Sequence, residues 1–149
     1  MKTAIIFDWV GTLAQSGEEE RLMLDEHAEK VVEMLHGRYK LAVISKATNP
    51  RQRYQEIAQS PLNHYLVHIQ ACHEKTEAAV QEALRALEVQ GNQCYAVDDR
   101  VRNFPAFNRL GCETIWLQQG MYAEERPQHH EEAPCRIIAH LPELIQLLV

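Results

Sequence analysis

Short apolar segments alternate along the chain with longer segments in which apolar residues recur every three or four positions. The short segments, flanked by Gly, Asp, Asn or charged residues, predict β-strands. The predicted strands are Thr3–Phe7, Tyr39–Ile44, Tyr65–Ile69, Gln93–Val97 and Glu113–Leu117. Because strands that alternate with helices form a parallel sheet with both faces covered, the pattern predicts an α/β fold with about five strands.

Three longer segments have the spacing of amphipathic helices. Their predicted apolar faces are Leu24, Ala28, Val31, Val32 and Leu35, then Val80, Ala83, Leu84 and Leu87, and finally Leu141, Leu144, Ile145 and Leu148. We expect these faces to pack on the sheet, the last one as a C-terminal helix. Residues Gln119–Pro134 follow neither period and contain Gly, Pro and a His pair, so they predict a surface loop.

Length and composition predict one domain over residues 1–149, because the chain has 149 residues, of which 46% are hydrophobic. It carries 21 Asp and Glu against 15 Lys and Arg, a net charge of −6, which argues against broad capture of nucleic acid or anionic lipid. The first apolar run ends at Asp8 and is too short for a signal sequence or a membrane span. The 4 cysteines are widely spaced, which favours reduced thiols. We therefore expect a cytoplasmic protein that does not bind membranes and shows no sign of a nucleic-acid partner, although a small local basic patch is compatible with this charge.

Reactive side chains cluster after the predicted strands or at the start of a predicted helix. They are Asp8 and Thr12 after the first strand, Ser45 after the second, Lys75 before the helix containing Val80, and Asp98 and Asp99 after the fourth strand. Parallel sheets collect their chemistry at the carboxyl edge of the strands. A carboxylate, hydroxyls, a lysine and an acidic pair at that edge suit phosphoryl transfer through an aspartyl-phosphate with a divalent cation. Gly11 would let the backbone turn sharply beneath the phosphate.

Four segments occur in the order of a known motif set. They are Phe7-Asp8-Trp9-Val10-Gly11-Thr12-Leu13, Ile44-Ser45, Lys75 ahead of a Glu/Ala/Leu-rich helix, and Val97-Asp98-Asp99-Arg100 with Asn103. Together they resemble the signature motifs of the haloacid dehalogenase (HAD) superfamily. The resemblance covers about Lys2–Gly120 and continues in Ile137–Leu148 as a terminal strand and helix. It implies a three-layer αβα sandwich around a Rossmann-like parallel sheet.

The resemblance also implies roles for these residues. Asp8 would be the nucleophile, Thr12 and Ser45 the phosphate-binding hydroxyls, and Lys75 the cation that pairs with Asp8 and the transferring group. The implied cofactor is Mg²⁺, and the implied metal ligands are Asp8, the backbone carbonyl of Val10 and Asp99, with Asp98 as second choice and Asn103 as a supporting residue.

The first motif departs from the family at Val10, where most of the phosphatases carry a second Asp that acts as general acid and base. Loss of such a group typically costs about 10²–10⁴-fold in rate, and less when the leaving group is already good. Family branches without this Asp include ion-pump ATPases, 2-haloacid dehalogenases and phosphonoacetaldehyde hydrolases. The last branch has Asp-Trp-Ala-Gly-Thr, which resembles Asp8–Thr12 most closely.

The spacing between motifs predicts a protein without a cap domain. From Asp8 to Ser45 is 37 positions and from Ser45 to Lys75 only 30. An open site suits a large substrate. Alternatively, a second copy of the chain covers the mouth of the site and closes the pocket. We therefore predict a Mg²⁺-dependent phosphohydrolase whose phosphorylated substrate is macromolecular or has a good leaving group. The alternatives are a catalytically impaired phosphate-binding or interaction protein and, less favoured, a phosphonatase- or dehalogenase-like hydrolase.

Purely structural interpretations stay open for single residues. Asp8 could cap a turn, Ser45 could cap a helix that begins near Pro50, and Lys75 could be a solvated residue at a helix start, although a cation there opposes the helix dipole. The adjacent acids Asp98 and Asp99 repel each other unless a cation compensates them. The histidines near the third strand and in the 119–134 loop are expected at the surface, not at a metal.

Overall fold

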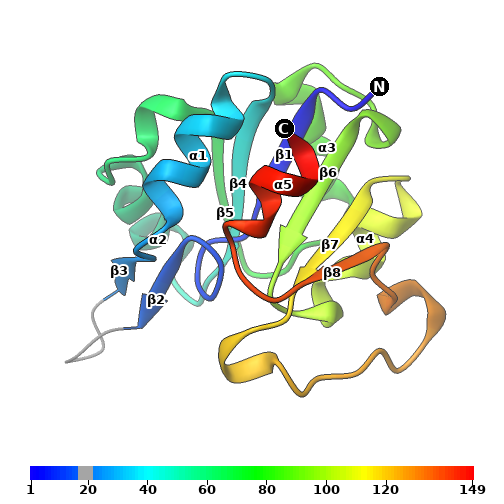
Figure 1. Cartoon of the computed structure of the whole chain (residues 1–149). Helices are drawn as coiled ribbons and strands as arrows, with labels where there is room; N and C mark the ends of the chain where they lie inside the picture. The colour runs from blue at the N-terminus through cyan, green and yellow to red at the C-terminus, as the bar shows by residue number, and fades with distance from the viewer. Residues whose placement is uncertain (17–21) are drawn as a thin grey trace.

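A computed structural model of the chain describes residues 1–16 and 22–149. Six parallel strands form one sheet, and helices cover both of its faces (Figure 1). In spatial order the strands are β5 (Leu66–Cys72), β4 (Lys40–Lys46), β1 (Ala4–Phe7), β6 (Cys94–Asp98), β7 (Glu113–Leu117) and β8 (Arg136–Ile138). The three-layer α/β architecture is confirmed, with six strands where about five were predicted.

Alternate residues of the central strand β1 serve the two faces of the sheet, because successive side chains of a strand point to opposite sides. Ile5 and Phe7 lie in the core beneath the helices α1 and α5, whereas Ala4 and Ile6 lie in the core beneath α3 and α4. The helices are α1 (Ala28–His36), α2 (Pro50–Ala58), α3 (Glu77–Leu87), α4 (Phe104–Arg109) and α5 (Glu143–Leu148). Since all four residues of β1 are buried, this strand fixes the position of Asp8, the residue that follows it.

The predicted strands are confirmed with small changes at their ends. β7 has the predicted bounds, while β4 and β6 continue to Lys46 and Asp98, two residues and one residue beyond the predicted ends. β5 runs on to Cys72 because it pairs with β4 as far as Lys46. These extensions carry Ser45 and Asp98 inside the sheet, where ladder hydrogen bonds hold their backbones.

A short hairpin between β1 and α1 was not predicted. It consists of β2 (Ala14–Ser16) and β3 (Leu22–Leu24), which pair antiparallel, and residues 17–21 at its tip are not described. Leu24, predicted on the first helix, belongs to β3 instead, because it pairs with Ala14. The remaining residues of that predicted face, from Ala28 to Leu35, are buried in α1 as expected.

Two segments flank the carboxyl edge of the sheet. The hairpin lies on one side of this edge, and the loop between β7 and β8 lies on the other (Figure 1). The loop has the predicted position and includes two short 3₁₀ turns, although Glu132 within it is buried. Among the described residues, no helix is long and apolar enough to cross a membrane.

Candidate active site

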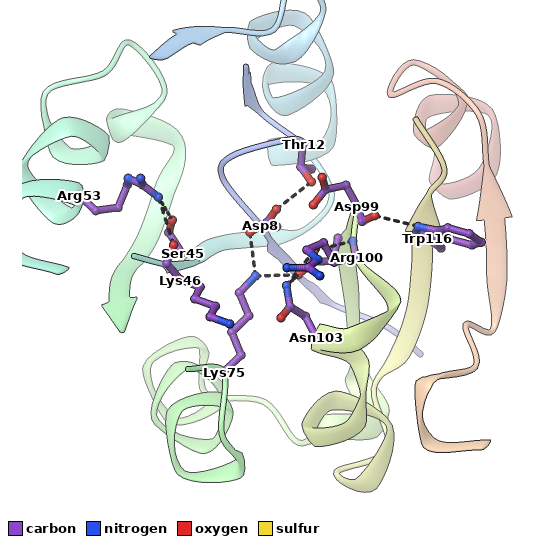
Figure 2. Close-up of polar contacts among 11 residues, drawn as sticks. Asp8, Thr12, Ser45, Lys46, Arg53, Lys75, Asp99, Arg100, Asn103 and Trp116 are labelled. Atoms are coloured by element: carbon purple, nitrogen blue, oxygen red, sulfur yellow. Dashed lines mark hydrogen bonds and ion pairs between the residues drawn. The ribbon is translucent and has the colours of Figure 1, made fainter. Parts of the chain in front are cut away.

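The predicted site residues meet at the carboxyl edge of β1, β4 and β6 (Figure 2). Phe7 pairs with Val43 of β4 and with Val97 of β6, so the residues that follow these positions lie side by side. Asp8 and Asp98 both bond to Lys75, which comes from the segment between β5 and α3. The structure therefore brings together side chains that are far apart in the sequence.

Lys75 is the centre of a buried ionic network. Its Nζ donates to Oδ1 of Asp8 at 2.8 Å and to Oδ2 of Asp98 at 2.7 Å. The side chain of Lys75 is only 2% exposed, so it is not a solvated residue at a helix start. Thr76 caps α3 instead, since its hydroxyl accepts from the N–H of Ala79.

The ionisation of this network reflects burial and opposite charges. Burial lowers the pKa of Lys75, but the charges of Asp8 and Asp98 outweigh it and raise that pKa above its usual value. Burial, followed by repulsion from Asp98, raises the pKa of Asp8, and Lys75 acts against both effects. Lys75 is therefore the group that most favours the anionic form of Asp8, against burial and Asp98.

Replacing Lys75 with methionine is expected to lower the free energy of unfolding by about 3 kcal/mol, because it leaves two buried carboxylates without their cation. Urea denaturation of the metal-free protein at pH 7 measures this loss. Lys30→Met on the exposed face of α1 is the matched control, with an expected change within about 0.5 kcal/mol. Equal stability of both variants would show that the network contributes nothing net to folding.

Asp98 and Asp99 have different surroundings. The carboxylate of Asp98 accepts from Lys75, from the backbone N–H of Arg100 at 3.0 Å and from Nδ2 of Asn103 at 3.1 and 3.3 Å. Among the described residues, no cationic side chain pairs with the carboxylate of Asp99, which lies beside those of Asp8 and Asp98, and its backbone carbonyl accepts from Nε1 of Trp116 at 2.9 Å. Asp98, held by Asn103, thus positions Lys75, whereas Asp99 has no cationic partner within the described ranges.

Three carboxylates come close enough together to share one ion. One oxygen from each of Asp8, Asp98 and Asp99 lies within 4.8 Å of the others. No other group of three or more His, Cys, Asp or Glu side chains within residues 1–16 and 22–149 meets this condition, so the histidines form no such cluster there. Carboxylate oxygens are the hard ligands that Mg²⁺ prefers, and the donor set therefore fits this ion.

Gly11 is required where the chain passes over Asp99. Its φ is +89°, in the left-handed region that favours glycine, and a side chain at this position would collide with the carboxylate of Asp99. The predicted sharp turn is therefore confirmed. It also serves a second purpose, because it leaves room for the carboxylate directly beneath it.

The metal-free protein is expected to become less stable as the pH rises from about 5 to about 9. Burial and the charges of Asp8 and Asp98 raise the pKa of Asp99 to about 9. The folded state therefore retains a proton that the unfolded chain releases at about pH 4. The free energy of unfolding falls as the pH rises from the pKa of the unfolded chain to that of the folded state.

Thermal unfolding of the wild type and of Asp99→Asn, both in chelator, separates the contribution of Asp99 from that of other groups. The variant has no proton to lose at this position, so its stability is expected to fall less over the same range. Parallel pH profiles for the two proteins would contradict the assignment of this slope to Asp99.

The two predicted phosphate-binding hydroxyls are both buried at the site. Thr12 Oγ1 donates to Oδ2 of Asp8 at 3.3 Å, and Ser45 Oγ accepts from Nη1 of Arg53 at 2.8 Å. Ser45 does not cap α2, because the side chain of Asn49 does so by accepting from the N–H of Gln52. The capping interpretation of Ser45 is therefore wrong.

One residue at the site, Arg53, was missed in the sequence, and so were the partners of Arg100. Arg53 projects from α2 to Ser45, and no local pattern in the sequence marked it. On the other side, Arg100 stacks on Tyr122 with its guanidinium carbon 3.9 Å from the ring centre and bonds to Glu125 at 3.1 Å. No local pattern connects Arg100 with Tyr122 and Glu125, because they belong to different segments.

Val10 lies at the mouth of the site. It lines a cavity of about 430 Å³ together with Asp8, Asp99 and Asn103. A carboxylate at this position would face the same cavity, so its absence bears directly on the chemistry. Trp9, in contrast, is buried and lines a neighbouring groove.

Comparison with known proteins relates this chain to others by its structure. No family model and no curated protein matches it. A HAD phosphatase from Thermococcus onnurineus superposes with a TM-score of 0.80 at 13% identity, over 99% of this chain and 98% of that one. A haloacid dehalogenase-like hydrolase from Streptococcus pneumoniae gives 0.78 at 13%, over 99% of both chains. An L-2-haloacid dehalogenase gives 0.79 at 14%, over 99% of this chain and 98% of that chain. The chain therefore has the fold of the HAD superfamily.

Proposed function

We propose that this HAD-fold protein is a Mg²⁺-dependent phosphohydrolase that works through an aspartyl-phosphate on Asp8. The observation that carries the proposal is the arrangement around this carboxylate. Asp8 is held by a buried lysine, lies beside two more carboxylates and borders an open cavity. A carboxylate kept anionic by a lysine is a competent nucleophile toward phosphorus. We take residues 1–149 as one catalytic domain.

The proposed Mg²⁺ ligands are Asp8, Asp99 and the backbone carbonyl of Val10. Asp98 is a weaker candidate because both of its oxygens already accept hydrogen bonds. When bound, Mg²⁺ supplies positive charge that offsets the repulsion between Asp8 and an incoming phosphate. The carboxylate of Asp99, which has no cationic partner within residues 1–16 and 22–149 and lies beside that of Asp8, supports this assignment.

In the proposed reaction an oxygen of Asp8 attacks the phosphorus, and the bond to the leaving oxygen breaks with its electron pair going to the leaving group. Lys75 holds Asp8 in place and lies beside the transferring group. The hydroxyls of Thr12 and Ser45 are the donors available to the remaining phosphoryl oxygens. Water then attacks the phosphorus, the bond to Asp8 breaks with its electron pair returning to the carboxylate, and the protons of the water go to the released phosphate and to solvent.

Val10 limits the leaving groups that this site can serve. No carboxylate at position 10 protonates a departing alcohol or accepts a proton from water. The leaving groups of acyl phosphates, phosphoanhydrides and aryl phosphates depart as stable anions, so these substrates need such help least. We therefore propose a substrate with such a leaving group, or a phosphorylated macromolecule, for which the open site has room. A second copy of the chain would cover the mouth of the site if the substrate is small.

We also propose a cytoplasmic location, which the unpaired cysteines support.

The second candidate is a phosphate-binding or interaction protein that has lost turnover. Val10 favours it, since the fold and the ionic network can persist without catalysis. A dehalogenase-like reaction is less favoured because cleavage of a carbon–halogen bond needs no metal, which leaves the three clustered carboxylates without a purpose.

Hydrolysis of acetyl phosphate and of an aryl phosphate, with Mg²⁺ and with a chelator, tests the proposal. We expect turnover with Mg²⁺, its loss on chelation, and acetyl phosphate to be preferred over an alkyl phosphate. Activity equal to that of an Asp8→Asn variant would reject the proposal. Phosphate binding without turnover would support the second candidate.

A further inference from the structure

Two hollows meet at the carboxyl edge of the sheet. The cavity of about 430 Å³ over Asp8 and Asp99 adjoins a groove of about 930 Å³ between the β2–β3 hairpin and α2. Both are lined by Val10, Ala47, Thr48 and Arg53. A phosphoryl group at Asp8 fills only the inner part of this space, so the groove is available to the rest of a substrate.

Arg53 stands at the junction of the two hollows with part of its guanidinium already fixed. Nη1 donates to Ser45 Oγ at 2.8 Å and to the carbonyl of Lys46 at 3.3 Å, and Nε donates to Glu56 at 3.2 Å. Within the described part of the chain, Nη2 has no hydrogen-bond partner, and the side chain is 18% exposed. A guanidinium that is held on one side and open on the other is organised to bind an anion.

Lys46 adds a second cation at the same place. It follows Ser45 at the end of β4, is exposed and lines the inner cavity together with Arg53. No ion pair involves Lys46 among residues 1–16 and 22–149, whereas Arg100 on the opposite wall is paired with Glu125. Positive charge is therefore in excess on the Arg53 side, in a chain whose net charge is −6.

The protein's own carboxylates at the centre do not need these cations. Asp8, Asp98 and Asp99 carry three negative charges when ionised, and Lys75 together with a divalent ion would neutralise them. Glu56 accounts for only one of the two junction cations. The surplus is thus left for the ligand.

We propose that the leaving group of the substrate carries a second anionic group, bound at the junction by Nη2 of Arg53 and by Lys46, and that its remaining part lies in the groove. This inference rests on the proposed function and narrows the substrate to phosphorylated compounds with a further carboxylate or phosphate. One wall of the groove is formed by Trp9, Leu22 and Leu24, and it offers apolar contact to the uncharged part of the substrate.

Binding of three phosphonates of matched length tests the inference without turnover. Ethylphosphonate has no second anion, 3-phosphonopropionate adds a carboxylate, and ethane-1,2-bisphosphonate adds a second phosphonate. Calorimetry at one fixed Mg²⁺ concentration is expected to show that at least one of the two compounds with a second anionic group binds about tenfold tighter than ethylphosphonate. The compound with the larger gain identifies the second group as a carboxylate or a phosphate.

Variants of the junction complete the test. Arg53→Met is expected to reduce the preference to about twofold or less, and Lys46→Met to reduce it in part. Arg51→Met is the matched control, because Arg51 lies exposed on the same helix, lines neither hollow and should keep the preference. If Arg53→Met does not fold, as judged by circular dichroism, Lys46→Met decides alone.

Equal affinity of the wild type for all three phosphonates would overturn the inference, as would a preference that survives both junction variants. A preference that depends on Arg53, found in a protein without hydrolytic activity, would reject the proposed function and leave the anion site standing. The two failures are therefore distinguishable.

Discussion

Replacing Asp8 with asparagine is expected to lower kcat by about 10⁴-fold or more, because an amide cannot form the phosphoenzyme. The variant keeps the volume of the side chain and an oxygen that can accept from Lys75, which donates to Asp8 at 2.8 Å. Steady-state hydrolysis of acetyl phosphate with Mg²⁺ measures the loss. Intact-mass analysis after an acid quench gives a second readout, since the phosphoryl adduct should form on the wild type alone.

Asp25→Asn is the matched control for this experiment. Asp25 lies between the hairpin and α1, accepts from the N–H of His27 and lines neither hollow. Its replacement should leave kcat within about twofold, as for a change outside the site. Wild-type turnover in Asp8→Asn would mean that the nucleophile is another group.

Introducing aspartate at Val10 is expected to raise kcat for an alkyl phosphate by about 10²-fold, the lower end of what a general acid contributes. The position suits this gain because Val10 lines the cavity that also contains Asp8 and Asp99. Acetyl phosphate should gain far less, because its leaving group is already stable. Saturating Mg²⁺ is needed, since a fourth carboxylate adds to the repulsion in the site.

Val10→Asn is the control that separates proton transfer from polarity, and it should show no gain. If Val10→Asp creates turnover in a protein that has none, the wild type is a phosphate-binding protein with an otherwise intact site. A protein that hydrolyses alkyl phosphates well without this change would refute the role assigned to Val10, and another residue would have to supply the proton.

The architecture could be predicted because buried parallel strands are continuous apolar runs. Ala4–Phe7 is fully buried, and its hydrophobic pattern alone identifies it. The hairpin could not be predicted, since β2 and β3 have three residues each and neither alternates apolar with polar residues: β2 has one apolar residue, and β3 has three in a row. Strands this short form through pairing with each other, and Leu24 therefore joined Ala14 and left the helical pattern.

The candidate site was predicted in part. Asp8, Lys75 and Asp98 meet as expected, because each follows a strand or precedes a helix at one edge of the sheet. The relative surroundings of Asp98 and Asp99 were not accessible from their adjacency. β6 ends at Asp98 and Asp99 lies in the bend that follows, so one carboxylate faces Lys75 and Asn103 while the other lies beneath Gly11.

The sequence by itself determined the chemistry that this chain can offer: a carboxylate, hydroxyls, a lysine and an acidic pair after buried strands, with valine where a second acid would act. Only the tertiary structure decided which of these groups are paired and which stay open to a ligand. Lys75 is paired with Asp8 and Asp98. Within residues 1–16 and 22–149, in contrast, the carboxylate of Asp99 has no cationic partner and Nη2 of Arg53 has no hydrogen-bond partner. The reason is physical: hydrophobic periodicity records burial along one segment, but a hydrogen bond depends on the distance between segments that folding brings together.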